Sequence, residues 1–356
     1  MTDLFSPIRL GNLELSNRMV VAPMTRNRAP QGIPTKLMAE YYRQRATAGL
    51  IVTEGAQISE QGIGYPATPG IHADEQIDGW QTVTEAVHDA GGHIFCQLWH
   101  CGRISHPDYH GGDKPVAPSA ILAAGQAFTY EGLKDFFEPR AFDADEIPGV
   151  VEQYRHAAAC AMQAGFDGVE LHSANGYLLD QFLRDATNRR TDLYGGSIEH
   201  RIRLLKEVTE AVVVEIGADK VGVRISPVNA FNDIHDSDPQ ALFNQVASML
   251  SGLGVAYLHI VEVTMIGEID TAVNMTEIRG HFNGLYIANG AYDKTRGNAA
   301  IVENRADLVA YGVPYLANPD LPERFKQNAV LNEADQATFY GGDGHGYTDY
   351  PTLRKR

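Results

Sequence analysis

The amino-acid sequence predicts a (β/α)8 TIM barrel that forms a single domain over residues 1–356. Eight short strand-like runs follow one another, and most of them are separated by amphipathic stretches of helical periodicity. Alternating strands and helices predict a parallel sheet, and eight repeats predict that this sheet closes on itself. No linker rich in proline or serine divides the chain, so the whole length is assigned to one barrel.

The predicted strands are short and mostly apolar, and they lie at 19–24, 50–54, 93–99, 168–172, 220–226, 256–261, 284–288 and 307–312. The clearest helical segments lie at 35–47, 79–90, 147–164, 198–215 and 238–252. In the first of these, Leu37, Met38 and Tyr41 provide apolar positions opposite a polar side, and Gly49 follows as a stop signal.

Two regions interrupt this alternation. Residues 4–17 have the pattern of a β-hairpin with Gly11 and Asn12 at its turn, and we expect this hairpin to cap the barrel floor. Residues 101–146 form a long insertion after the third strand, rich in glycine, proline, histidine and aromatic residues. Because segments of that length in compact domains are usually functional or disordered, a lid over the active face is predicted.

Composition excludes several classes of function. A formal charge of −16 argues against a nucleic-acid surface, and we interpret the acidity as a source of solubility. Cys96, Cys101 and Cys160 are too few and too scattered for a disulfide framework or a zinc-binding spacing. Neither a signal peptide nor a run approaching the ~18 apolar residues of a membrane span is visible. A cytoplasmic protein without membrane or nucleic-acid partners is expected.

The most informative stretch is 169–177, in which a short apolar run ends in His172, Asn175 and Tyr177. An imidazole, an amide and a phenol can all donate hydrogen bonds, and all are ordinarily uncharged near neutral pH. Such a set suits a site that polarises a carbonyl or nitro oxygen and then delivers a proton. The alternative is a loop whose polar groups only satisfy the local backbone.

The remaining strand ends strengthen the first interpretation, because the reactive face of such barrels lies at the carboxyl ends of the strands. Strand alternation places Gln97 and Trp99 on one side of the third strand, and Gly222 and Arg224 on one side of the fifth. Together with Thr25, these groups make a poor metal site and a good site for a flat heterocycle.

A metal site is not predicted. His93, His100, His106 and His110 surround the third strand and its insertion. Barrel metal hydrolases, however, usually carry a His-x-His motif after strand one, and this chain has Ala-Pro-Met at 22–24.

The chain resembles the Old Yellow Enzyme family of FMN-dependent ene-reductases, and within it the bacterial nitrate-ester and enoate reductases. The likeness runs from residue 4 to residue 351. Its specific motifs are APMTR at 22–26, QLWHCGR at 97–103, the block 172–201 with NRRTDLYGGS at 188–197, and ANPDL at 317–321.

The resemblance implies an FMN site at these strand ends. Thr25 corresponds to the hydroxyl that meets flavin O4, Gln97 to the partner of the pyrimidine edge, and Arg224 to the cation near N1 and O2. An arginine there stabilises the negative charge that gathers on the reduced ring. Pro23, Met24 and Gly55 correspond to residues that line the ring through their backbone.

The resemblance also implies the substrate residues and the reaction. His172 and Asn175 correspond to the pair that holds the substrate oxygen, and Tyr177 to the proton donor. Trp99 matches a substrate-pocket position, although core packing is the alternative for it. Tyr347 is expected to close over the flavin edge and to line the substrate pocket. NAD(P)H would reduce the flavin, and an α,β-unsaturated carbonyl compound would then be reduced, with nitro compounds and nitrate esters as further substrate classes.

The phosphate site departs from the family pattern. Barrel phosphate sites commonly use the loops after strands seven and eight, and here these loops contain Asn289-Gly290 and Gly312-Val313. The family usually has arginine where this chain has Val313. We therefore expect a weaker hold on FMN, unless a nearby cation compensates; the candidates are Lys294, Arg296 and Arg324.

Two other functions stay open at this point. One is a reductase of quinones or oxygen, in which alkene reduction is incidental. The other is a flavin-poor barrel that serves as a binding protein, which the missing arginine suggests and the intact site residues oppose. NADH and NADPH are both possible donors, and a monomer and a homo-oligomer are both possible assemblies.

Overall fold

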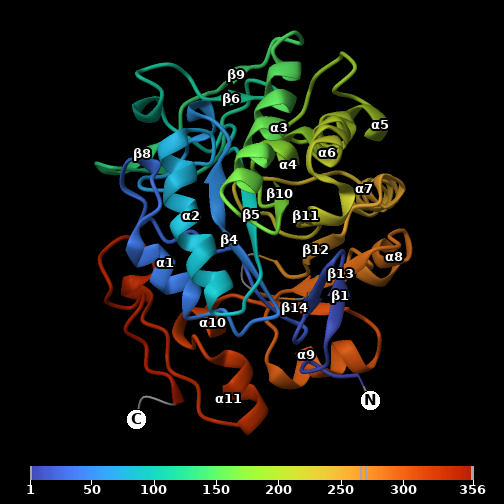
Figure 1. Cartoon of the computed structure of the whole chain (residues 1–356). Coiled ribbons are helices and arrows are strands. Elements are labelled where there is room, and N and C mark those ends of the chain that lie inside the picture. Colours follow the sequence, from blue (N-terminus) through green and yellow to red (C-terminus); the bar gives the residue numbers. More distant parts are fainter. Residues whose placement is uncertain (1, 265–266, 269–270, 354–356) are drawn as a thin grey trace.

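The computed structural model describes residues 2–264, 267–268 and 271–353, and within them eight parallel strands close into a barrel (Figure 1). In chain order the strands are β3 (Met19–Val21), β4 (Leu50–Gln57), β5 (Ile94–Trp99), β10 (Gly168–Ser173), β11 (Val221–Ile225), β12 (Tyr257–Val261), β13 (Leu285–Asn289) and β14 (Leu308–Tyr311). All eight predicted strands are confirmed. The first is shorter than predicted and ends before Pro23, which has no N–H to continue the ladder.

Helices surround the barrel: α1 (Lys36–Arg43), α2 (Asp74–Asp89), α3 (Ile147–Gln163), α4 (Leu178–Leu183), α5 (Ile198–Arg201), α6 (Arg203–Ile216), α7 (Pro239–Leu253), α8 (Met275–Gly280), α9 (Lys294–Val302), α10 (Val313–Ala317) and α11 (Leu321–Gln327). The five predicted helical segments are confirmed, except that 198–215 is divided at Ile202. Helix α2 also begins five residues before the predicted start. Within the described ranges, no helix combines the length and apolar character needed to cross a bilayer.

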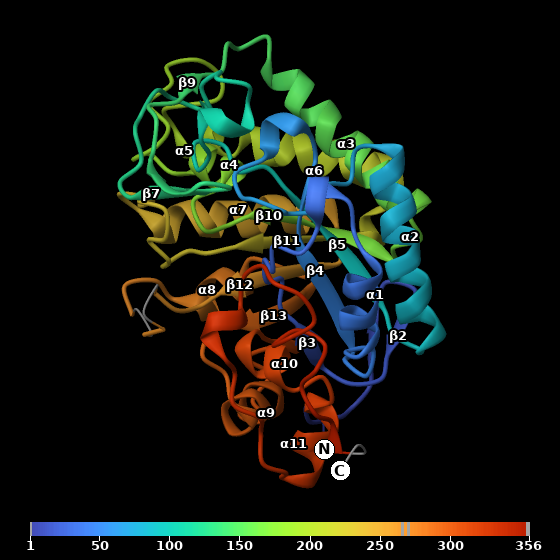
Figure 2. The same ribbon diagram turned by 90° about the vertical axis from the view of Figure 1, so that its left-hand side faces the viewer.

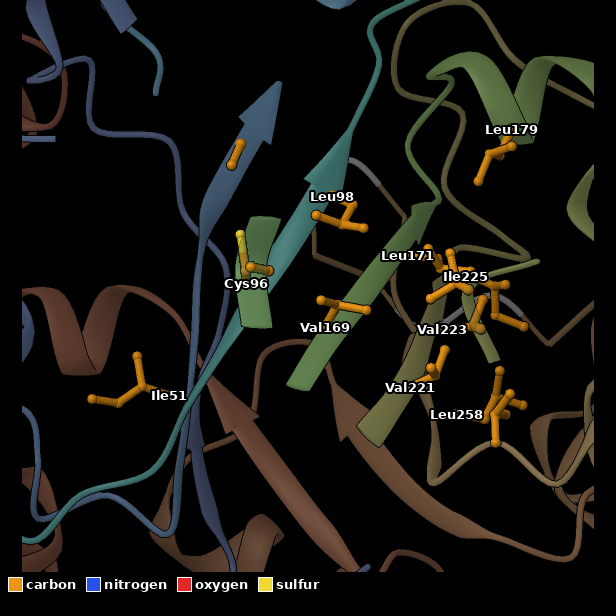
Figure 3. Packing of buried hydrophobic residues seen from close by; sticks show 14 of the residues in the cluster. Ile51, Cys96, Leu98, Val169, Leu171, Leu179, Val221, Val223, Ile225 and Leu258 are labelled. Atoms are coloured by element: carbon orange, nitrogen blue, oxygen red, sulfur yellow. The ribbon is translucent and has the colours of Figure 1, made fainter. Parts of the chain in front are cut away.

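Strand alternation separates the hydrophobic core from the barrel interior. Outward side chains pack beneath the helices in one large cluster; those labelled on neighbouring strands in Figure 3 include Cys96, Leu98, Val169, Leu171, Val221 and Val223. The residues between them, which include Gln97, Glu170 and Arg224, therefore point into the barrel. Gly222 is required there, since a Cβ at this position would lie 2.0 Å from the Tyr257 ring.

The predicted hairpin is confirmed as β1 (Ile8–Leu10) and β2 (Leu13–Leu15), which pair antiparallel across the turn at Gly11. Leu10 and Leu15 belong to the same buried cluster as Val20, Val52 and other side chains of the barrel strands. The hairpin therefore closes the lower end of the barrel, as expected.

The insertion after β5 contains two small sheets, one of β6 (Val116–Ala117) and β9 (Arg140–Ala141) and one of β7 (Gln126–Thr129) and β8 (Gly132–Asp135). It gathers at one end of the molecule, where Figure 2 shows β7 and β9 together. Phe128 of β7 lines a cavity together with Tyr177, so the insertion reaches the face on which the strands end.

Candidate active site

A small cavity of about 90 Å³, here called the inner cavity, lies at the carboxyl ends of the barrel strands. Its nine lining residues come from the ends of β3, β4, β5, β10 and β11, and all were predicted as site residues: Pro23, Thr25, Gly55, Gln97, Trp99, His172, Asn175, Tyr177 and Arg224. Parallel strands end on one side of the sheet, which is why residues up to 201 positions apart in sequence meet here.

The inner cavity adjoins a larger one of about 500 Å³, here called the outer cavity. The two share Pro23, Thr25 and Tyr177. Two further predicted residues, Met24 and Val313, line only the outer cavity. A ligand in the outer cavity would therefore lie directly beside the polar groups of the inner one.

An aromatic cluster forms one wall. The Trp99 and Tyr177 rings meet edge to face with their centroids 4.9 Å apart, and the His172 and Tyr177 rings lie 5.1 Å apart. Burial, and then the positive charge of Arg224, lower the pKa of His172 well below its usual value. The imidazole is therefore neutral at pH 7 and acts as a hydrogen-bond donor and acceptor without carrying charge.

The turn after β10 holds Asn175 in a defined place. Asn175 has a φ of 58°, a conformation that asparagine tolerates better than most residues. Its N–H donates to Ser226 Oγ at 2.7 Å, and its carbonyl oxygen accepts from Asn232 Nδ2 at 2.8 Å. These bonds fix the backbone from which the amide enters the inner cavity.

Tyr177 is a buried phenol, with 7% of its surface exposed. Burial, followed by the neighbouring Tyr65, raises its pKa well above the usual value. The hydroxyl is therefore protonated at neutral pH, as a proton donor requires. It lies 3.0 Å from the Tyr65 hydroxyl, a contact that was not predicted.

Beneath the inner cavity, Glu170 is completely buried and receives three hydrogen bonds. Gln97 Nε2 donates to it at 2.8 Å, His259 Nδ1 at 2.8 Å and the Tyr257 hydroxyl at 3.1 Å. Burial alone would raise its pKa, but His259, these hydrogen bonds and the nearby Arg224 hold the pKa of Glu170 below its usual range. We call Glu170, Tyr257 and His259 the carboxylate cluster.

Sequence reasoning missed the carboxylate cluster, although one signal was available. Glu170 precedes His172 by two residues on the same strand, so alternation places both side chains on the inner face. Its register partner on β5 is Gln97. Because a carboxylate only accepts hydrogen bonds, it fixes which end of the Gln97 amide turns away from the cavity.

Arg224 is buried and partly tied to the next strands. Its Nη2 donates to Asn289 Oδ1 at 2.9 Å, and Asn289 Nδ2 donates in turn to the Ala310 carbonyl at 3.0 Å. Asn289, which is predicted to bind the cofactor, also positions Arg224 through its side chain. In the described part of the chain, Arg224 Nε and His172 Nδ1 are buried without a hydrogen-bond partner.

These features fit a flat polar heterocycle such as the flavin ring. The buried atoms Arg224 Nε and His172 Nδ1 need partners, and Gln97 offers an oriented amide. Gly55 leaves room at the wall, since a Cβ there would lie 2.5 Å from the Trp99 ring.

The prediction that Tyr347 lines the substrate pocket is wrong. Tyr347 is fully buried and stacks on Tyr41, with the ring centroids 4.1 Å apart and an interplanar angle of 4°. The guanidinium groups of Arg26 and Arg28 lie over the same ring at 4.9 and 4.3 Å. This cation–π packing holds the ring in the core, and Tyr340 from the same segment lines the outer cavity instead.

The expected phosphate residues follow two neighbouring strands, since Asn289 at the end of β13 pairs in register with Ala310 of β14. Gly312 caps α10, and Val313 begins that helix with half of its surface exposed. Gly290 lines a separate cavity of about 860 Å³ together with Arg296. Of the three candidate cations, Arg324 is excluded because it is buried and paired with Asp320 at 2.7 Å.

Lys294 donates to Asn328, whereas Arg296 donates to the carbonyl oxygen of Ala291, the residue after Gly290. Of the three candidates, Arg296 is therefore the one with a hydrogen bond to the loop after β13.

The histidines near the third strand do not gather around a common point. His100 Nδ1 accepts a hydrogen bond from the Gly102 N–H at 3.0 Å, and burial lowers the pKa of His100 to about 3. Among the described residues, no three histidine, cysteine, aspartate or glutamate side chains are grouped as metal ligands would be.

The chain is similar to known flavin-dependent reductases in both sequence and structure. A sequence model of the NADH:flavin oxidoreductase / NADH oxidase family matches residues 3–332. The chain is 45% identical to 12-oxophytodienoate reductase 1 of Oryza sativa subsp. japonica, over 99% of this chain and 93% of that protein. It is also 45% identical to 12-oxophytodienoate reductase 7 of the same plant, over 98% and 94%.

Two solved structures are similar along their whole length. Morphinone reductase in complex with tetrahydroNAD superposes with a TM-score of 0.95 at 47% identity, covering 99% of this chain and 98% of that one. The Old Yellow Enzyme homologue from Zymomonas mobilis gives 0.96 at 45% identity, covering 99% and 100%.

Proposed function

This chain belongs to the NADH:flavin oxidoreductase / NADH oxidase family and is an FMN-dependent oxidoreductase that uses NAD(P)H, and we propose that it reduces the activated C=C bond of α,β-unsaturated carbonyl compounds. The observation that carries this proposal is the inner cavity, where a neutral imidazole, an amide and a protonated phenol face Gln97 and Arg224. Nitro compounds and nitrate esters are further candidate substrates, because they also present an oxygen to be polarised.

Each residue of the inner cavity has a distinct task in this proposal. FMN, when bound, supplies the hydride that it accepts from NAD(P)H. Thr25, Gln97 and Arg224 hold the ring, with the Arg224 charge facing the edge that becomes more negative. His172 and Asn175 hold the substrate oxygen by hydrogen bonds. Tyr177 gives its hydroxyl proton to the carbon next to the carbonyl group.

The first test is an anaerobic visible spectrum of the purified protein and of Tyr177→Phe. We expect flavin absorbance that NADPH bleaches and 2-cyclohexenone restores. In Tyr177→Phe the restoration should be slower by roughly 10²- to 10⁴-fold, the usual contribution of a general acid, while bleaching by NADPH keeps its rate. Equal restoration rates in the two proteins would contradict the role of Tyr177.

The same experiment separates the alternative functions. An aerobic oxidase rate that exceeds anaerobic enone turnover would favour a reductase of oxygen or quinones. A colourless protein that gains activity with added FMN would keep the proposed function and indicate a weak phosphate site. A colourless protein that FMN does not rescue would refute the proposal.

Val313→Arg should strengthen FMN binding. A charge-assisted contact contributes about 1.5–3 kcal/mol, which corresponds to roughly 10- to 100-fold in affinity. The dissociation constant is measured by titrating the apoprotein with FMN and following the quenching of its fluorescence. Val214→Arg is the matched control, because Val214 is exposed on the outer helix α6. An unchanged dissociation constant in Val313→Arg would refute the idea that this position limits FMN binding.

The proposal treats residues 1–356 as one FMN-binding unit that acts on small molecules in the cytoplasm. The net charge of −16 opposes a nucleic-acid partner, and three free cysteines suit a reducing compartment.

A further inference from the structure

Tyr65 links the proton donor to a second cleft. Its hydroxyl lies 3.0 Å from that of Tyr177, and its ring stacks on Trp99 with the centroids 5.4 Å apart. The preceding Gly64 packs tightly, since a Cβ there would lie 2.2 Å from the Ile104 carbonyl oxygen. The loop after β4 therefore holds the Tyr65 hydroxyl in place against Tyr177.

A cleft of about 480 Å³, here called the side cleft, lies on the other side of Tyr65. Its walls come from the insertion around β7 and from the loop between β11 and α7, including Asn232 and Asp233. Three side chains line both the side cleft and the outer cavity: Tyr65, Phe128 and Phe231. Of these, Tyr65 alone carries a group that can transfer a proton. Tyr177 lines the inner and outer cavities and is not among the residues that line the side cleft.

Tyr177 needs such a link while it gives up its proton. When it gives up its proton, a phenolate would remain at a site where burial disfavours that charge. A substrate in the outer cavity would also separate Tyr177 from water on that side. Because the Tyr65 hydroxyl already contacts the Tyr177 hydroxyl, it can supply a proton as Tyr177 loses its own. An isolated phenolate then does not have to form in the buried site. The Asn232 amide lies near both hydroxyls and opposes part of the rise that burial causes in the pKa of Tyr65 and Tyr177.

We propose that Tyr65 is the proton relay of this enzyme and resupplies Tyr177 from water in the side cleft. The inference rests on the function proposed above. Both transfers occur in one step: the Tyr177 O–H bond breaks as the new C–H bond forms at the substrate, and the Tyr65 O–H bond breaks as the Tyr177 O–H bond is restored. Tyr65 then takes a proton from solvent, so each turnover consumes one solvent proton and no electrons pass through either tyrosine.

The test uses Tyr65→Phe holoenzyme, which keeps the ring that stacks on Trp99. The reduced enzyme is mixed anaerobically with 2-cyclohexenone in H₂O and in D₂O. We expect reoxidation to slow by about 10-fold or more, with a changed solvent isotope effect, since the variant loses one of the protons in flight. Bleaching by NADPH, and reoxidation by ferricyanide, which takes only electrons, should keep their wild-type rates.

Tyr130→Phe is the matched control. The Tyr130 hydroxyl accepts a hydrogen bond from the Ala67 N–H at 3.0 Å, so this variant loosens the same loop without changing the contact with Tyr177. We expect wild-type rates for it. An equal loss in Tyr130→Phe, or an equal loss with enone and ferricyanide in Tyr65→Phe, would assign Tyr65 a structural role and overturn the relay.

The relay would also be overturned if Tyr65→Phe kept the wild-type rate of reoxidation by the enone and the wild-type solvent isotope effect. A wild-type enzyme that fails to reduce the enone defeats the proposed function instead, so the two failures are distinguishable.

Discussion

Glu170→Ala is expected to destabilise the folded protein by about 3–5 kcal/mol, the usual cost of removing one partner from a buried charged cluster. Three donors, from Gln97, Tyr257 and His259, would lose their acceptor at once. The buried Arg224 would also lose the negative charge that stabilises it most strongly. The effect is large because none of these groups can turn to water: Glu170, Tyr257 and His259 are each 0% exposed.

Urea unfolding of the apoprotein measures this loss without any contribution from FMN. Glu54→Gln is the control, because Glu54 is also fully buried on a barrel strand, β4, which β5 separates from β10. Burial raises the pKa of Glu54 to about 7, so replacing its carboxyl group by a neutral amide is a mild change near neutral pH. Equal losses in Glu170→Ala and Glu54→Gln would show that the carboxylate cluster holds no ionised group.

The same variant also tests how the inner cavity is organised. Without Glu170, the Gln97 amide is free to turn, and the Arg224 charge is no longer offset. We therefore expect weaker FMN binding and a changed flavin reduction potential in Glu170→Ala, with neither change in Glu54→Gln.

The barrel and the inner cavity were predictable because both depend on local periodicity. Alternation along a strand decides which side chains point inward, and parallel strands bring their carboxyl ends together. Knowing where each strand ends was enough to bring Gln97, His172 and Arg224 into one cavity. The roles given to these residues stay predictions, because they came from the family resemblance.

What could not be predicted depends on partners that are distant in the sequence. A buried carboxylate such as Glu170 is stable only with donors from other strands, and a single run of residues gives no sign of them. Tyr347 carries no local signal that separates a ring in the core from one over a cofactor. Its place is decided by two arginines more than 300 positions earlier. The Tyr65 contact depends on a loop conformation, which side-chain periodicity does not encode.

Acid should destabilise this protein at a pH above the range in which exposed carboxylates titrate. His100 and His172 are buried and neutral in the folded state, and burial lowers the pKa of both, to about 3 for His100. In the unfolded chain each would bind a proton below about pH 6.5. The unfolded state therefore takes up more protons, and the free energy of unfolding falls as the pH drops below that value.

For His100 the loss continues down to about pH 3, at roughly 1.4 kcal/mol per pH unit. His172 contributes to the loss in the same direction, because burial lowers its pKa as well.

Urea unfolding at several pH values between 7.5 and 5 measures this slope, and His100→Asn isolates one histidine. The asparagine oxygen can still accept from the Gly102 N–H, so the fold keeps that hydrogen bond while the titrating group is lost. The slope should become shallower by about one proton. His345→Asn, at an exposed site where Asp349 raises the histidine pKa, should leave the acid slope nearly unchanged. If His100→Asn keeps the full slope, buried neutral His100 is not a cause of the acid sensitivity, and the carboxylates must account for it.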